Sequence, residues 1–253
     1  FHHLVRCVPG EGLIVHRQGV PAIEQMLEMG CWTPLASFGV GSGSGADWWA
    51  ELLSADGSSF RLQREGAEAI DIDWTYCGLH NVENALAAMA AARHVGVAPA
   101  VAAAAVAAFR GVKRRLELLG TVDDVAVYDD FAHHPTAIAT TLQGLRARTA
   151  SGRLIALIEP RSNTMRMGEH RAGLAQATAT ADRVYWYQPA GMDWSLEDVI
   201  DASPVPARVA DDIDALADTV AAESRSGDRV VIMSNGGFGG IHGKLLAALE
   251  NRI

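Results

Sequence analysis

Carboxylates and imidazoles follow directly after a short apolar segment near the middle of the chain. Residues 125–128 (Val-Ala-Val-Tyr) lead into Asp129 and Asp130, and His133, a second histidine and a proline come next. In chains that alternate strands with helices, ligands bind at the carboxyl ends of the strands. We therefore predict a ligand site in which Asp130 accepts hydrogen bonds from ribose hydroxyls or a metal-bound water. The alternative is that the two aspartates only cap the helix that follows.

The adjacent histidines also raise the question of a metal centre. Neighbouring side chains diverge, and neither HxxxH nor HExxH spacing surrounds His133 and His134. A dedicated metal site is therefore not expected. We expect one histidine to contact a ligand and the other to serve the fold.

A run of cations precedes these acids, because residues 112–117 read Val-Lys-Arg-Arg-Leu-Glu. Arg115 and its neighbours place positive charge beside Asp130, and this favours an anionic, phosphorylated substrate. We interpret the acids and cations as half of a site whose other half lies outside this chain.

A second polar loop, residues 159–167, also follows an apolar segment. It carries Arg161, Asn163 and a second arginine, and arginine can bind a carboxylate through two parallel hydrogen bonds. The loop thus favours a substrate with free carboxylates. The alternative is a solvated loop that caps the next helix.

A third loop, residues 234–240 (Ser-Asn-Gly-Gly-Phe-Gly-Gly), opens the last predicted helix. Its glycines expose backbone N–H groups toward an anion at the start of that helix. Neither common nucleotide loop is present. Phe238 occupies the first glycine position of the Walker pattern, and His242 occupies the last glycine position of GxGxxG.

Two asparagines, Asn81 and Asn84, stand three residues apart where an alanine-rich helical stretch begins. This spacing puts both on one helix face, where their amides can pair with the edges of an adenine. The alternative is that an asparagine here is only a helix cap.

The elements that must position these groups fall into two parts. The first half has a helix near 22–29, a hairpin turn at Asp56-Gly57 and alanine-rich helices at 80–95 and 99–109. Beyond Gly111 strands alternate with helices. The strands are expected at 125–128, 154–158, 183–187, 207–209 and 229–233, and the helices at 136–147, 169–179, 196–200, 213–224 and 241–250.

This alternation predicts an α/β fold with a doubly wound, mostly parallel, Rossmann-like sheet in the C-terminal half. The first half is expected to be the end of another α/β domain, with small antiparallel strands. We place the domain boundary between residues 111 and 112.

Composition argues against several kinds of partner and location. A net charge of −9 argues against nucleic acid or an anionic membrane as partner, and no apolar run approaches the roughly 20 residues of a membrane helix. Three scattered cysteines without a CxxC pair favour a reducing cytoplasm. The chain begins with Phe1 rather than Met, and we expect it to be a piece of a longer protein. The sequence does not indicate an oligomeric state.

Read in order, three segments resemble the Mur ligase family of ATP-dependent, amide-bond-forming enzymes. They are residues 78–88 (GLHNVENALAA), 111–117 (GVKRRLE) and 128–135 (YDDFAHHP). Within the family, the chain specifically resembles peptidoglycan-recycling ligases that join L-alanyl-γ-D-glutamyl-meso-diaminopimelate, the murein tripeptide, to UDP-N-acetylmuramate. This resemblance is carried by residues 1–6, 159–167 and 233–242.

The resemblance implies a role for each site residue. Adenine contacts would come from Asn81 and Asn84, and Arg115 would reach the ATP phosphates. Asp130 would hold the ribose and His133 would lie near the nucleotide. The incoming peptide would face Arg161, Asn163, Ser234 and Asn235. Residues 1–111 would be the C-terminal part of the central ATP-binding domain, and residues 112–253 the C-terminal domain.

The implied reaction has two steps. ATP phosphorylates the muramate carboxylate to an acyl phosphate, which the peptide's amino group then attacks. The GxxGK[ST] phosphate loop of the family does not occur in this sequence. ATP and Mg²⁺ would therefore be bound mostly by residues outside it, and the chain alone is expected to be inactive.

Two alternatives stay open. The parent protein could add a single L-alanine to the same sugar nucleotide, since such ligases share the His-Asn and Asp-Asp-aromatic-x-His-His motifs. A small amino acid, however, would hardly need two loop arginines. The second alternative is a module that binds a peptide or nucleotide without chemistry.

Overall fold

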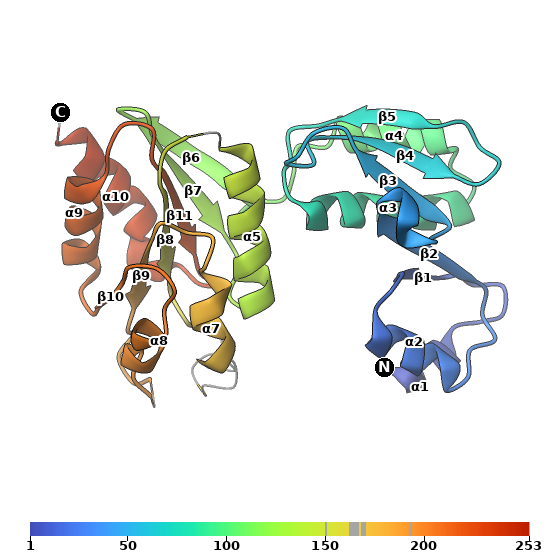
Figure 1. Ribbon diagram of the computed structural model, residues 1–253, viewed down its shortest axis with the longest axis horizontal. Coiled ribbons are helices and arrows are strands. Elements are labelled where there is room, and N and C mark those ends of the chain that lie inside the picture. The colour runs from blue at the N-terminus through green and yellow to red at the C-terminus, as the bar shows by residue number, and fades with distance from the viewer. Residues whose placement is uncertain (150, 162–166, 168–170, 193, 253) are drawn as a thin grey trace. The chain divides into compact units, whose positions relative to one another are not determined.

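The computed structural model describes residues 1–149, 151–161, 167, 171–192 and 194–252. The chain folds into two compact units, Phe1–Arg110 and Gly111–Ile253, and each is described by itself (Figure 1). In these described ranges no helix combines the length and apolar character needed to span a bilayer.

Unit 1 is built on a mixed sheet whose strands run in chain order. They are β1 (Ile14–Arg17), β2 (Leu35–Val40), β3 (Trp48–Leu52), β4 (Ser59–Arg64) and β5 (Ile70–Asp73). The predicted antiparallel strands are present as β3–β5, whereas β1–β3 pair in parallel. The helix α2 (Pro21–Glu28) lies between β1 and β2 in the chain, as parallel neighbours require.

The helices of unit 1 are α1 (His2–Cys7), α2, the short 3₁₀ turn η1 (Ser42–Ser44), α3 (Leu79–His94) and α4 (Pro99–Ala107). Helix α3 buries Val82, Ala85, Leu86, Met89 and Ala90. This spacing forms one apolar stripe, and the stripe packs with strand residues such as Trp48 and Phe60 in a common core.

Unit 2 contains the predicted doubly wound sheet. Its strands are β6 (Glu117–Val122), β7 (Val125–Asp130), β8 (Leu154–Ile158), β9 (Arg183–Tyr187), β10 (Ala207–Ala210) and β11 (Arg229–Met233), in the spatial order β10-β9-β8-β11-β7-β6. All neighbouring pairs are parallel except β6 with β7.

Helices cover both faces of this sheet (Figure 1). Side chains of α5 (Pro135–Arg148), α7 (Arg171–Ala177) and α8 (Glu197–Asp201) share one core, and those of α9 (Ile213–Glu223) and α10 (Ile241–Glu250) share the other. The 3₁₀ turn η2 (Phe238–Gly240) leads into α10. Because both faces are buried, the central strands are continuous apolar runs.

Candidate functional site

The first residues of the three polar loops, which follow β7, β8 and β11, lie side by side at one edge of the sheet. Strand β11 sits between β7 and β8, with Met233 level with both Asp130 and Ile158. Beyond the strand ends, Ser234 N–H donates to the Asp130 carbonyl at 3.1 Å, and Glu159 N–H donates to the Met233 carbonyl at 3.0 Å. The segments after β7, β11 and β8 therefore start at the same level of the edge.

Arg114 joins these loops. Its Nε donates to Asp129 Oδ2 at 2.9 Å, and its Nη2 donates to the Ser234 carbonyl at 2.7 Å. Its own backbone has φ of 61°, a region that costs a non-glycine residue roughly 1–2 kcal/mol. The sequence analysis singled out Arg115 and missed Arg114, because the sequence does not show which of two adjacent arginines has a hydrogen-bond partner within the fold.

Asp129 is the buried centre of an ion network. Besides Arg114, His242 on α10 places its Nε2 3.0 Å from Asp129 Oδ1. Burial alone would raise the pKa of Asp129, but the hydrogen bonds from His242 and Arg114 outweigh it and hold that pKa below its ordinary value. Nothing in the sequence pointed to His242 as a partner, since it lies 113 positions away.

Asp130 fastens the segment before β6 to the loop after β7. Its Oδ2 accepts from Leu116 N–H at 2.8 Å, while Oδ1 accepts from Ala132 N–H at 2.7 Å and from the Thr141 hydroxyl at 3.3 Å. Burial raises the pKa of Asp130 above its usual value, although these hydrogen bonds and the charge of Arg115 oppose the rise. The side chain has a structural role here, and its contact with a ribose stays a prediction.

The capping alternative for the aspartates is wrong, because α5 is capped by His134. Its Nδ1 accepts from Thr136 N–H at 3.3 Å, so one histidine does serve the fold. His133 is half-buried, with Nδ1 2.9 Å from the Phe131 carbonyl and its ring edge-on to the Phe131 ring. Its contact with a nucleotide stays a prediction.

Arg115 is exposed. Its guanidinium carbon lies 5.7 Å from the centre of the Phe131 ring, and that of Arg114 lies 5.4 Å from the same centre. One arginine is thus bound within the fold while the other presents its charge to solvent next to the loop after β7. An exposed guanidinium at the carboxyl end of a parallel sheet suits an anionic phosphate.

Ser234 holds two loops together. The side chain is fully buried; its hydroxyl donates to Glu159 and accepts from Gly236 N–H at 2.9 Å. Ser234 therefore has a positioning role in this structure, and the peptide contact predicted for it stays a prediction. Glu159 is itself a buried carboxylate that sequence reasoning did not single out.

Arg161 lies over the glycine-rich loop. A Cβ on Gly236 would come within 2.3 Å of Arg161 Nη1, so a larger residue here would displace the Arg161 side chain from its position over the loop. Asn235 is half-buried, and its Oδ1 is a buried atom without a hydrogen-bond partner in the described structure. Asn163 lies outside the described residues. Contacts of Arg161, Asn163 and Asn235 with a peptide stay predictions.

The two asparagines predicted to bind adenine belong to unit 1. Both lie on α3, and its N-cap is Gly78, so the capping alternative does not hold. Asn81 is half-buried and donates through Nδ2 to the Cys77 carbonyl at 2.7 Å, whereas Asn84 is exposed. Their pairing with adenine stays a prediction. Across the described parts of both units, no group of three His, Cys, Asp or Glu side chains is placed to hold a metal ion.

Known proteins match the whole chain. The family model "Mur ligase, glutamate ligase domain" matches residues 114–236. The chain is 46% identical over its full length to the UDP-N-acetylmuramate–L-alanyl-gamma-D-glutamyl-meso-2,6-diaminoheptandioate ligase of Escherichia coli (strain K12) and covers 54% of that protein. It is 32% identical, over 98% of its length and 54% of the relative's, to the UDP-N-acetylmuramate–L-alanine ligase of Mycobacterium ulcerans (strain Agy99).

A crystal structure of a murein peptide ligase from Psychrobacter arcticus 273-4 has the same fold. It matches with a TM-score of 0.77 and 45% identity over all of this chain and 54% of that one. The chain thus spans about half the length of the curated relatives it matches.

Proposed function

This chain belongs to the Mur ligase family, and from that premise we propose that the protein containing it is an ATP-dependent ligase. It joins L-alanyl-γ-D-glutamyl-meso-diaminopimelate to UDP-N-acetylmuramate, a step of peptidoglycan recycling in the cytoplasm. The observation that carries the proposal is the 46% identity to a ligase of that name across all 253 residues. The lower identity of 32% to an L-alanine ligase favours the peptide over the single amino acid.

The two units take different parts in this proposal. Unit 1 corresponds to the end of the ATP-binding domain, with Asn81 and Asn84 toward adenine. Unit 2 is the C-terminal domain, with Arg115 toward the phosphates and Arg161 toward carboxylates of the peptide. The exposure of Arg115 and of Arg161 supports both assignments.

The carboxylate of Asp130 is less accessible to a nucleotide than the side chains of Arg115 and Arg161. The residue is 4% exposed, and both its carboxylate oxygens accept hydrogen bonds within the chain. It could reach a ribose only if the segment carrying Leu116 moved away. We therefore propose that ribose binding by Asp130 is coupled to a movement of residues 114–116.

The proposed reaction needs no covalent bond to the enzyme. The muramate carboxylate attacks the γ-phosphorus of ATP, and ADP leaves. The peptide's amino group then attacks the acyl carbon, phosphate leaves, and an amide forms. Such catalysis rests on positioning and on neutralising phosphate charge. Arg115 would supply part of that charge, and Mg²⁺, bound mostly by residues outside this chain, would supply more.

The test is a ligation assay with the full-length protein, ATP, Mg²⁺ and UDP-N-acetylmuramate. With the tripeptide as acceptor we expect ADP release and a product of the summed mass less water; with L-alanine we expect neither. Arg115→Ala should raise KM for ATP, whereas Arg208→Ala, which removes an exposed arginine paired with Glu223, should not.

Each result separates the candidates. Preference for L-alanine would establish the alternative ligase. Binding of peptide or nucleotide without product would leave the non-catalytic module. We expect no turnover from the isolated 253-residue chain, and ligation by it would contradict the assignment of ATP binding to residues outside it.

A further inference from the structure

His242, the second residue of α10, forms a carboxylate–imidazole pair at the candidate site of unit 2. Its Nε2 lies 3.0 Å from Asp129 Oδ1, and Asp129 is ionised near neutral pH because its neighbours hold its pKa below the ordinary value. An ionised carboxylate only accepts hydrogen bonds, so Nε2 is the donor. In the neutral ring the other nitrogen, Nδ1, then carries a lone pair.

The Nδ1 atom of His242 is open to solvent. The side chain is 20% exposed. Within the described ranges Nδ1 has no hydrogen-bond partner, and it does not belong to the buried polar atoms that lack one. An accessible imidazole nitrogen whose opposite nitrogen is held by a carboxylate is the arrangement of a general base. The carboxylate orients the ring and stabilises the imidazolium that forms.

The turn before α10 fixes where His242 lies. Phe238, Gly239 and Gly240 have φ of 42°, 55° and 75°, three successive residues in the left-handed region. The Phe238 ring is fully buried and packs on Tyr187, with 5.5 Å between the ring centres, and this packing offsets the strain of a non-glycine residue there. The imidazole is therefore presented from a fixed helix start.

Other candidate bases of the site are engaged or lack a charged partner. Both oxygens of Asp130 accept hydrogen bonds within the chain, and the buried Glu159 accepts from the Ser234 hydroxyl. His133 places Nδ1 2.9 Å from the Phe131 carbonyl, a neutral group that stabilises an imidazolium less than a carboxylate does. Only the imidazole of His242 combines an open nitrogen with an ionised partner among these described side chains.

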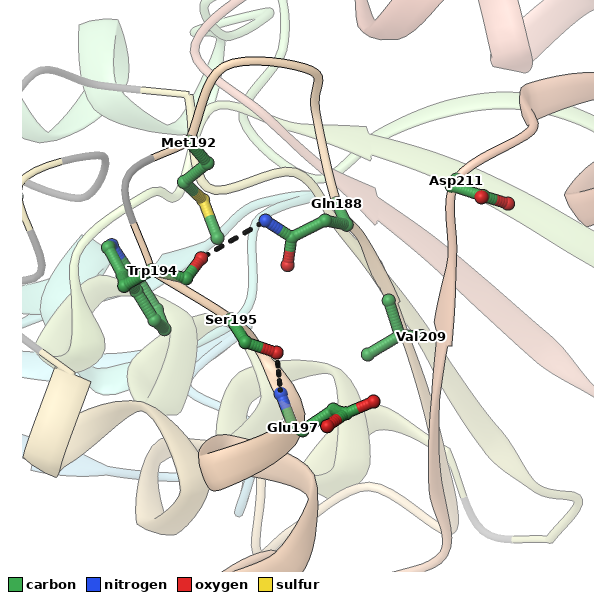
Figure 2. A pocket seen from close by; sticks show the side chains of 7 residues that line it. All are labelled: Gln188, Met192, Trp194, Ser195, Glu197, Val209 and Asp211. Carbon is green, nitrogen blue, oxygen red and sulfur yellow. Dashed lines mark hydrogen bonds between the residues drawn. The ribbon is translucent and has the colours of Figure 1, made fainter.

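Two further carboxylates lie on the same edge but too far along it. Glu197 and Asp211 line a hollow of about 550 Å³ after β9 and β10 (Figure 2). Figure 2 shows the Asp211 carboxylate turned away from the hollow. Strand β9 is the third strand from β7, and neighbouring strands lie about 4.8 Å apart, which places the hollow roughly 14 Å from the strand of Asp129. These acids do not serve a reaction at the ends of β7 and β11.

His242 is joined to the segment predicted to hold phosphate. Asp129 accepts from His242 through Oδ1 and from Arg114 Nε through Oδ2, the latter at 2.9 Å. The next residue, Arg115, is exposed and is proposed to reach the phosphates. A base in this position lies beside the acyl phosphate if Arg115 binds its phosphoryl group.

His242 also follows the loop proposed to receive the peptide. Arg161 lies over Gly236, and α10 begins where the loop of residues 234–240 ends. A peptide bound by Arg161 along this loop can thus bring its amino group to the start of α10.

We propose that His242, oriented by Asp129, is the general base of amide formation. The proposal rests on the proposed function. The peptide's neutral amine bonds to the acyl carbon and its proton passes to Nδ1 of His242. The bond from the acyl carbon to the phosphate oxygen breaks, the electron pair leaves with phosphate, and the imidazolium returns its proton to water. The first step, phosphorylation of the muramate carboxylate, removes no proton from nitrogen and needs no such base.

The experiment measures the two steps separately in full-length His242→Gln. Glutamine keeps an N–H donor for Asp129 but has no basic nitrogen. Hydroxylamine, a strong nucleophile that is uncharged at neutral pH, traps the acyl phosphate as a hydroxamate in the absence of peptide and so reports the first step. We expect hydroxamate to form at the wild-type rate. Single-turnover ligation of the tripeptide should be about 100-fold slower or more, with KM for the peptide within about twofold of wild type.

Lys244→Gln is the matched control, because it removes a cation two positions further along α10, where Lys244 pairs with Asp214. Both steps should keep their wild-type rates in it. His242→Asn should show the same split as His242→Gln, so that a folding defect in one variant does not decide the question.

Three results would overturn the proposal: undiminished tripeptide ligation by the His242 variants, equal slowing of both steps in them, or an equal loss of ligation in Lys244→Gln. A raised KM for the peptide at an unchanged ligation rate would also overturn it, since it would give His242 a binding role. A wild type that forms neither hydroxamate nor ligated peptide would instead refute the proposed function.

Discussion

Arg114→Leu should destabilise unit 2 far more than removal of an arginine normally does. Leucine keeps much of the aliphatic packing but has no donor for Asp129 Oδ2 or for the Ser234 carbonyl. The first contact is an ion pair with a carboxylate whose side chain is 9% exposed, and the second satisfies a backbone acceptor of a fully buried residue.

The expected loss follows from these two contacts. Hydrogen bonds to charged groups contribute about 1.5–3 kcal/mol each, so the upper limit is roughly 6 kcal/mol. Two features reduce it: the Arg114 side chain is 28% exposed, and Asp129 keeps His242 as a partner. We expect a loss of about 2–3 kcal/mol in the free energy of unfolding.

Native-state hydrogen exchange read by mass spectrometry measures this loss in unit 2 alone. Amides of β7 and β11, the strands that carry Asp129 and lead into Ser234, should exchange roughly 30- to 150-fold faster in the variant, at about 1.4 kcal/mol per factor of ten. Arg208→Leu is the control, because its ion pair with Glu223 leaves the Arg208 side chain 61% exposed. Exposed pairs contribute about 1 kcal/mol or less. The reasoning would be refuted if Arg114→Leu and Arg208→Leu lost equal stability, or if Arg114→Leu lost less than about 0.5 kcal/mol in the free energy of unfolding.

Three more predictions concern unit 2. Gly239→Ala should lower the free energy of unfolding in urea by about 1–3 kcal/mol, because φ is +55° and the new Cβ would lie 2.2 Å from an isoleucine of α9. Gly237→Ala is the control: its φ is −81° and the space around it is open, so this variant should be nearly as stable as the wild type. Carboxyl NMR titration should place the pKa of Asp129 below 3.8 and that of Asp130 above it. The stability that Asp129 contributes is then lost as pH falls through its lowered native pKa, whereas the stability that Asp130 contributes is lost as pH rises through its raised native pKa. If the two carboxyl groups titrated with the same midpoint, both pKa predictions would be contradicted. Asp228→Ala should lower the free energy of unfolding, measured by calorimetry, by about 3–5 kcal/mol. The reason is that Asp228 is 2% exposed and is the ion-pair partner of the half-buried Arg153. A loss below about 1 kcal/mol would count against a buried ion pair.

Sequence reasoning located the central strands of unit 2 well for a physical reason. The observed bounds of β8, β9 and β11 are those predicted, because strands buried on both faces must be short apolar runs bounded by polar residues. Strand β6 was missed. It is a half-exposed edge with an irregular register near Gly120, and its hairpin turns at Asp123-Asp124, two non-glycine residues with positive φ, in place of the usual Asn-Gly or Asp-Gly signal.

The site was predicted at the level of loops but not of atoms. Topology alone brings the segments after β7, β8 and β11 together, so polar residues at strand ends were sufficient evidence. The partners of Asp129 and Asp130 depend on the pleat, which points successive side chains to opposite faces of the sheet. Whether His242 lies on the face of Asp129 is set by the path of α10, and no local pattern encodes that.

In two pairs of adjacent, identical residues at this site, one member is bonded within the fold and the other is predicted to contact a ligand. Arg114 is bound within the fold while Arg115 is exposed, and His134 caps α5 while His133 is half-buried beside Phe131. The bound member of each pair fixes the backbone that presents the other, because both belong to one short segment. Substituting a bound member should therefore change stability first, and ligand contacts only through it. Substituting the other member of each pair, Arg115 or His133, should change ligand affinity more than stability, and this difference separates positioning residues from binding residues here.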